Sequence, residues 1–75
     1  MIVTIHVEDA MTNNELVDIL NMFDWDLVTR RATFLETLFE CRPMYDGAGL
    51  EAAALIAEEI ERTYNVSACV VDVEY

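Results

Sequence analysis

The stretch WDLVTRRATFLETLFECR, residues 25–42, determines the topology of this chain, because its second half fits either a strand or a helix. Residues 25–29 alternate between apolar and polar side chains, which is typical of a half-buried strand. The dipeptide Arg30-Arg31 that follows lacks the glycine or the Asn-Gly pair that a tight hairpin prefers. The pattern of residues 34–41 therefore has to be judged separately.

Residues 34–41 have two interpretations. As a strand, they place Leu35 and Phe39 on one face and Leu38 on the other. As a helix, these three side chains form one stripe, and Thr33 with Glu36 forms a capping box. We favour the strand, because threonine and aromatic side chains fit a pleated surface and because the order of the surrounding elements is consistent with it. The alternative is a smaller sheet with residues 34–41 helical.

Four further elements flank this stretch. Residues 2–7 are mostly β-branched and alternate, which predicts a strand. Thr12 and Glu15 form a capping box ahead of apolar residues at helical spacing, which predicts a helix over about 13–23. After a loop with two glycines, apolar residues recur at intervals of three and four, which predicts a helix over about 49–64. Alternation returns over residues 66–74 and predicts a last strand.

The resulting order, β-α-β-β-α-β, predicts one α+β domain over residues 1–75, a ferredoxin-like βαββαβ sandwich. Right-handed crossovers place both helices on one face of a four-stranded antiparallel sheet, whose first strand lies between the third and the last. The face covered by the helices is expected to hold Val3, Ile5, Val7, Leu27, Leu35, Phe39, Cys69, Val71 and Val73. The open face is expected to hold Ile2, Thr4, His6, Asp26, Val28, Arg30, Phe34, Glu36, Leu38, Glu40, Val70, Asp72 and Glu74.

Charge excludes several classes of partner. Fifteen acidic residues against four arginines and no lysine give a net charge of -11 at pH 7. Such a chain repels nucleic acids and anionic membranes, so we expect it to bind neither directly. No apolar run approaches the roughly 20 residues of a membrane-spanning helix, and no basic residue flanks the apolar start as in a signal peptide. We therefore expect an intracellular, cytoplasmic protein.

No residue pattern predicts an active site, a metal site or a cofactor. His6 is the only histidine, and the predicted sheet directs the cysteines and Ser67 away from it. Cys41 and Cys69 would lie two strand spacings apart, about 9.5 Å, which exceeds the roughly 7 Å that a disulfide allows. We expect both cysteines to be buried free thiols. Catalytic residues, metal ligands and cofactors are thus predicted to be absent, and the protein is predicted not to be an enzyme.

The size and acidity of the whole chain resemble the small acidic inhibitors that bacteriophages encode against host defence, such as anti-CRISPR and anti-restriction proteins. The resemblance is one of general character and rests on no shared motif. It implies a non-enzymatic protein in an infected bacterial or archaeal host. Such a protein would occupy a basic nucleic-acid-binding surface of a complex such as a CRISPR effector, with carboxylates standing in for phosphates. The candidate partner-binding residues are Asp26, Glu36, Glu40, Asp72 and Glu74 on the open face, and Glu51, Leu55, Glu58, Glu59 and Glu61 on the last helix.

Two other interpretations of the same charge remain open. High acidity without lysine also suits a protein from a salt-loving organism, in which carboxylates maintain solubility. Many ferredoxin-like domains are homodimeric modules that bind a ligand or regulate another protein, and a homodimer is the alternative prediction here.

Overall fold

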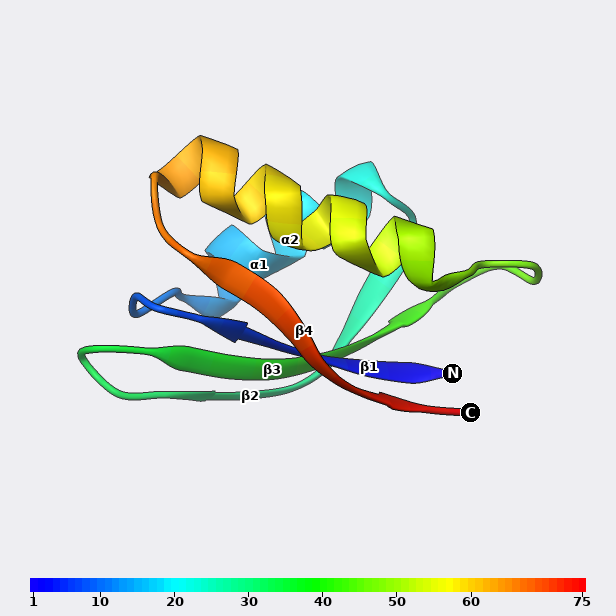
Figure 1. Cartoon of the computed structure of the whole chain (residues 1–75), viewed down its shortest axis with the longest axis horizontal. Helices are drawn as coiled ribbons and strands as arrows, with labels where there is room; N and C mark the ends of the chain where they lie inside the picture. Colours follow the sequence, from blue (N-terminus) through cyan, green and yellow to red (C-terminus); the bar gives the residue numbers. More distant parts are fainter.

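Six elements follow one another in the order strand, helix, strand, strand, helix, strand. They are β1 (Ile2–Val7), α1 (Asn13–Met22), β2 (Trp25–Ala32), β3 (Thr37–Pro43), α2 (Leu50–Tyr64) and β4 (Ala68–Glu74). In this computed structural model, which describes residues 1–75, the strands form one antiparallel sheet in the order β2-β3-β1-β4. Both helices cover one face of the sheet (Figure 1). The predicted ferredoxin-like fold is confirmed, and the alternative with residues 34–41 helical is wrong.

The ambiguous stretch forms a long hairpin of β2 and β3. β2 extends to Ala32, further than the alternation over residues 25–29 indicated. The backbone N–H of Thr33 donates to the carbonyl oxygen of Glu36 at 2.9 Å. The hydroxyl of Thr33 accepts from the backbone N–H groups of Leu35 (3.1 Å) and Glu36 (3.2 Å). Thr33 and Glu36 therefore close a turn and do not start a helix. Leu35, predicted to be buried, is exposed in that turn together with Phe34.

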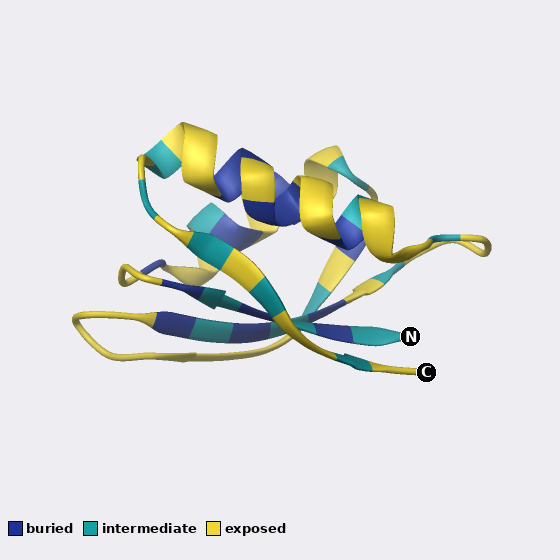
Figure 2. Ribbon diagram, in the orientation of Figure 1, coloured by how far each residue is buried: buried dark blue, intermediate teal, exposed yellow.

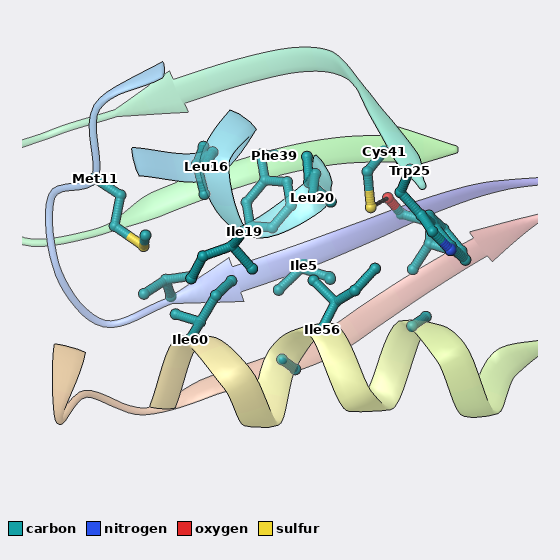
Figure 3. Close-up of a cluster of buried hydrophobic side chains, with 14 residues drawn as sticks. Ile5, Met11, Leu16, Ile19, Leu20, Trp25, Phe39, Cys41, Ile56 and Ile60 are labelled. Carbon is teal, nitrogen blue, oxygen red and sulfur yellow. Dashed lines mark hydrogen bonds between the residues drawn. The ribbon is translucent and has the colours of Figure 1, made fainter. Parts of the chain in front are cut away.

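One hydrophobic core lies between the sheet and the helices. Ile56 and Ile60 of α2 point toward Ile5 and Phe39 of the sheet (Figure 3). Fully burying one side chain of this kind stabilises the fold by about 1.5–3 kcal/mol. Figure 2 shows exposed residues along the outward side of α2 and buried residues on the side facing the sheet. The buried core consists of Val3, Ile5, Val7, Met11, Leu16, Ile19, Leu20, Trp25, Phe39, Cys41, Ala53, Ile56, Ala57 and Ile60.

A bulge interrupts the pairing of β4 with β1. Thr4 pairs with Asp72 and Ile5 pairs with Val70, so Val71 is an extra residue between the two pairs. A bulge of this kind shifts the alternation of one strand relative to its neighbour. The side chains of β4 before and after Val71 therefore alternate between the two faces of the sheet in opposite phase.

This bulge overturns three of the predicted orientations on β4. Cys69 pairs with His6 and is exposed on the open face, although it was predicted to be buried. Val70 packs against the core from the helix side, although it was predicted to lie on the open face, and Val71 is exposed. Val73 packs against the core as predicted. The prediction failed because it extended one unbroken alternation along the whole strand.

A second bulge lies in β2. Leu27 pairs with Cys41 and Thr29 pairs with Glu40, which leaves Val28 as the extra residue. Thr29 therefore faces the open side of the sheet. Arg30, predicted for the open face, lies on the helix side, where its Nε donates to the carbonyl oxygen of Met11 at 2.6 Å. Both bulges are on edge strands, where they disfavour pairing with a further strand.

The helices begin and end as the sequence indicates. Thr12 caps α1, since its hydroxyl accepts from the backbone N–H of Glu15 while the Glu15 carboxylate accepts from the backbone N–H of Thr12. α2 starts after Gly49 and ends at Asn65, which adopts the left-handed conformation with φ of 55°. Neither helix combines the length and the apolar character needed to cross a membrane.

Candidate functional site

The carboxylates far outnumber the cations that could neutralise them. Only two of the fifteen acidic side chains pair with an arginine, Asp26 with Arg42 and Glu59 with Arg62. A third, Glu36, has a carboxylate oxygen 2.9 Å from Nε2 of His6. Arg30 donates a hydrogen bond to the backbone carbonyl oxygen of Met11. Arg31 makes neither an ion pair nor a side-chain hydrogen bond. Most of the negative charge is therefore available to a partner.

The outward side of α2 carries a group of exposed carboxylates without an ion pair. Glu51, Glu58 and Glu61 are exposed, and Leu55, which is 51% exposed, lies between them. Spacings of four, three and three residues keep these side chains on one side of the helix. We call Glu51, Leu55, Glu58 and Glu61 the α2 acidic face. The expectation that Leu55 lies away from the buried stripe is confirmed.

Glu59 does not belong to this face, although it was predicted to face water. Only 9% of the residue is exposed, because position 59 lies beside the buried stripe that includes Ile60. Its carboxylate accepts hydrogen bonds from Arg62 Nε and from the hydroxyl of Thr63, both at 3.1 Å. The hydrogen bond from Arg62 lowers the pKa of Glu59, and the same contact raises the pKa of Arg62. The negative charge of Glu59 is thus matched within its own helix.

A depression of about 230 Å³ borders the α2 acidic face. Phe23, which follows α1, and Leu55 supply its apolar lining. Glu58 and the Glu59–Arg62 ion pair supply its charged lining. The site therefore combines an apolar surface with one unpaired carboxylate.

The open face of the sheet carries the other five predicted carboxylates, but three of them have partners within the chain. Asp26 Oδ2 lies 3.8 Å from Arg42 Nη2. Glu40 accepts a hydrogen bond from the hydroxyl of Thr29 at 2.6 Å. Glu36 is paired with His6. The remaining two, on β4, are Asp72 and Glu74, and both are exposed without an ion pair. Arg31 and Arg42 also lie on this face, so two arginines offset part of its negative charge.

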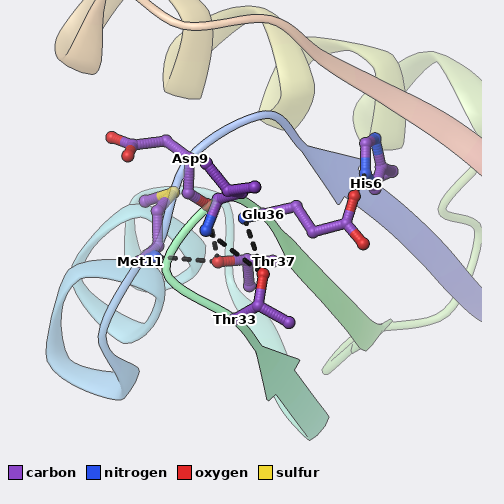
Figure 4. A network of polar contacts seen from close by, with 7 residues as sticks. His6, Asp9, Met11, Thr33, Glu36 and Thr37 are labelled. Carbon is purple, nitrogen blue, oxygen red and sulfur yellow. Dashed lines mark hydrogen bonds and ion pairs between the residues drawn. The ribbon is translucent and has the colours of Figure 1, made fainter.

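The only histidine lies on this open face, opposite an exposed cysteine. His6 Nε2 is 2.9 Å from Glu36 Oε2, so the ring is held at the base of the β2–β3 turn (Figure 4). Cys69 is the neighbour of His6 on β4. None of the four surface depressions is lined by His6 or Cys69. Cys41 is buried, and its burial raises the pKa of the thiol to about 12.

Sequence inspection did not single out Thr37, which fixes the loop between β1 and α1. Its buried hydroxyl donates to the carbonyl oxygen of Asp9 and accepts from the backbone N–H of Met11, both at 2.8 Å (Figure 4). The available signal was a threonine at a position whose strand neighbours Phe39 and Cys41 are buried. A polar side chain on a buried face requires hydrogen-bond partners.

No group of three or more histidine, cysteine, aspartate or glutamate side chains is arranged to hold a metal ion. Comparisons with protein-family models, curated protein sequences and solved structures give no match. The function of this chain has therefore to be inferred from its charge and its geometry.

Proposed function

We propose that this protein is a non-enzymatic, acidic binding protein of the phage-inhibitor type. It occupies a basic nucleic-acid-binding surface of a host defence complex, such as a CRISPR effector, and its carboxylates stand in for DNA phosphates. The observation that carries this proposal is the α2 acidic face, where three exposed carboxylates without an ion pair surround a half-exposed leucine.

Long-range electrostatics supports binding to a basic partner. A net charge of -11 on an 8.6 kDa chain produces a strong negative field. A field of this kind attracts positively charged surfaces and raises the association rate, and both effects weaken as salt increases. At an ionic strength of about 0.15 M, charges more than about 8 Å apart are largely screened. The binding should therefore depend on direct contact between α2 and basic side chains.

The depression beside α2 offers a contact for such a side chain. Phe23 and Leu55 form an apolar surface against which the hydrocarbon part of an arginine or lysine can pack. The carboxylate of Glu58 then meets the charged end, because it makes no ion pair within the chain, and the charge of Arg62, which lines the same depression, is already matched by Glu59. Apolar contact and charge pairing at one site give more affinity than isolated exposed ion pairs, which contribute about 0.2–1 kcal/mol each.

Neutralising the α2 acidic face tests the proposal. The variant Glu51→Gln/Glu58→Gln/Glu61→Gln removes three negative charges and keeps helix-compatible side chains. A matched control removes three exposed charges that make no ion pair and belong to neither candidate surface, through Glu8→Gln/Asp9→Asn/Asp18→Asn. Binding to purified, guide-loaded CRISPR effector complexes is measured by biolayer interferometry.

At roughly 0.5–1 kcal/mol for each lost charge contact, the α2 variant should bind about 10–100-fold more weakly. The control should lose much less, because only its overall charge changes. Equal losses in both variants would show that total charge, and not α2, determines binding. Failure of the unmodified protein to bind every effector tested would contradict the proposed partner class.

A further inference from the structure

The β2–β3 turn presents two apolar side chains to solvent at one end of the molecule. Phe34 is 84% exposed and Leu35 is 67% exposed. The turn projects beyond the helices at one end of the long axis (Figure 1). Three hydrogen bonds involving Thr33 fix its backbone. Such a preformed turn can dock without a large cost in conformational entropy. We call Phe34 and Leu35 the apolar tip.

An apolar depression lies at the opposite end of the long axis, along which the molecule measures 34 Å. The loop before α2 and the first turns of that helix form it, and Figure 1 shows this loop far from the β2–β3 turn. Its volume is about 650 Å³. The apolar residues that line it are Tyr45, Ala48, Leu50, Ala52 and Leu55.

The charges beside these two features that have no partner within the chain are complementary, whereas Glu36, directly after the apolar tip, contacts His6. Arg31, two residues before the turn, makes no ion pair or side-chain hydrogen bond. Glu51 lines the depression, and Asp46 belongs to the loop that forms it. Neither carboxylate has a cation partner within the chain. An unpaired cation thus adjoins the apolar tip, and unpaired anions adjoin the depression.

We propose that the apolar tip of one copy inserts into the α2 depression of a second copy, so that the protein associates head to tail. Arg31 of the first copy would then approach Asp46 and Glu51 of the second. A contact between two different surfaces leaves a free tip at one end and a free depression at the other, so it can repeat. This self-association does not rest on the proposed inhibitory function, but the contact covers Glu51 and Leu55 of the α2 acidic face and would therefore compete with binding to a basic partner.

The contact is expected to be weak and strengthened by salt. Two inserted side chains bury less than the roughly 1,200 Å² of a standard stable interface. Two copies with a net charge of -11 each repel one another until salt screens the repulsion. Binding to a basic partner has the opposite salt dependence. The same repulsion disfavours an anionic membrane as the occupant of the tip.

Three double variants define the test. Phe34→Ser/Leu35→Ser removes the tip, and Tyr45→Ser/Leu50→Asp disrupts the depression. Met22→Ser/Val71→Ser is the matched control, because both residues are exposed apolar side chains outside the two surfaces. All six positions are exposed, so the variants should fold. Mass is measured by sedimentation velocity at about 0.05 and 1 mM protein, in about 0.15 and 0.5 M NaCl.

The unmodified protein and the control should exceed the monomer mass of 8.6 kDa at the higher concentration, and more so at the higher salt. Each of the other variants alone should remain monomeric, whereas their mixture should form heterodimers and nothing larger, because only one complementary contact remains. A monomer under every condition would overturn the proposal. Association of either variant alone, or a mixture that stays monomeric, would overturn it as well, and a second protein or a lipid would then be the occupant of the tip.

Discussion

Replacing Thr37 by valine should destabilise the fold more than its single hydroxyl group suggests. The hydroxyl is buried and makes two hydrogen bonds of 2.8 Å, to the carbonyl oxygen of Asp9 and from the backbone N–H of Met11. Valine has nearly the same volume, so Thr37→Val opens no large cavity and leaves two backbone groups unpaired. Each such group costs about 1–3 kcal/mol when it is buried.

The expected loss in the free energy of unfolding is about 2–4 kcal/mol, because one of the two backbone groups is only partly buried. A domain of 75 residues has about 4–11 kcal/mol in total, at 0.05–0.15 kcal/mol per residue. With a urea m-value of about 1 kcal/mol/M, the midpoint should fall by about 2 M or more.

Urea unfolding followed by the fluorescence of Trp25, the only tryptophan and a buried one, measures this loss. Thr29→Val is the matched control, because the Thr29 hydroxyl bonds Glu40 on the exposed sheet face. It should change stability by less than about 0.5 kcal/mol. The role assigned to the buried hydroxyl would be refuted if Thr37→Val lost less than about 0.5 kcal/mol of stability, or if Thr29→Val lost as much as Thr37→Val.

Three further predictions follow from thiol burial, a shifted pKa and the net charge. In the native protein, a thiol reagent such as Ellman's reagent should modify Cys69 promptly and Cys41 only after denaturation. Cys41 is protected because it is buried, and its burial raises the pKa of the thiol to about 12. Rapid modification of both cysteines in the native protein would contradict this prediction. The hydrogen bond from Arg62 is the main cause that lowers the folded-state pKa of Glu59 from 4.5. The ionised Glu59 carboxylate therefore stabilises the fold above pH 4.5, and this stabilisation is lost as pH falls through the lowered pKa. Acid titrations should therefore show Glu59→Gln less stable than the unmodified protein at pH 7 and the difference shrinking below pH 4.5; a difference independent of pH would contradict it. Added NaCl should raise the melting temperature modestly and then reach a plateau as screening completes, whereas a steep rise up to molar salt would favour the halophilic explanation of the charge.

The order of elements could be predicted from periodicity, because each element carries a local signal. The capping box of Thr12 and Glu15 and the alternation in residues 2–7 both point to the structure that forms. The two bulges could not be predicted, because Val28 and Val71 lie in runs of residues that favour strands. Nothing in those runs marks a residue as unpaired, since pairing depends on the neighbouring strand.

The candidate site could be predicted only in part, because helical spacing indicates which residues of α2 are exposed but not which side chains they contact. Leu55 and the exposed glutamates of α2 follow from helical spacing. The position of Glu59 does not, because an acidic residue at the margin of the buried stripe reaches Arg62 and Thr63 only through its side-chain conformation. The exposure of Leu35 was missed because Thr33 closes a turn there, whereas Phe34 was predicted for the open face and is exposed in the same turn.

The proposed inhibition is tested most directly by DNA displacement from a defence complex. Fluorescence anisotropy of labelled target DNA on a purified, guide-loaded CRISPR effector is followed as the protein is added at several salt concentrations. The α2 acidic face predicts that the protein displaces the DNA, that displacement weakens as salt rises, and that Glu51→Gln/Glu58→Gln/Glu61→Gln displaces it about 10–100-fold less effectively. DNA that stays bound at saturating protein on every effector tested, or equal displacement by that variant, would contradict the proposal.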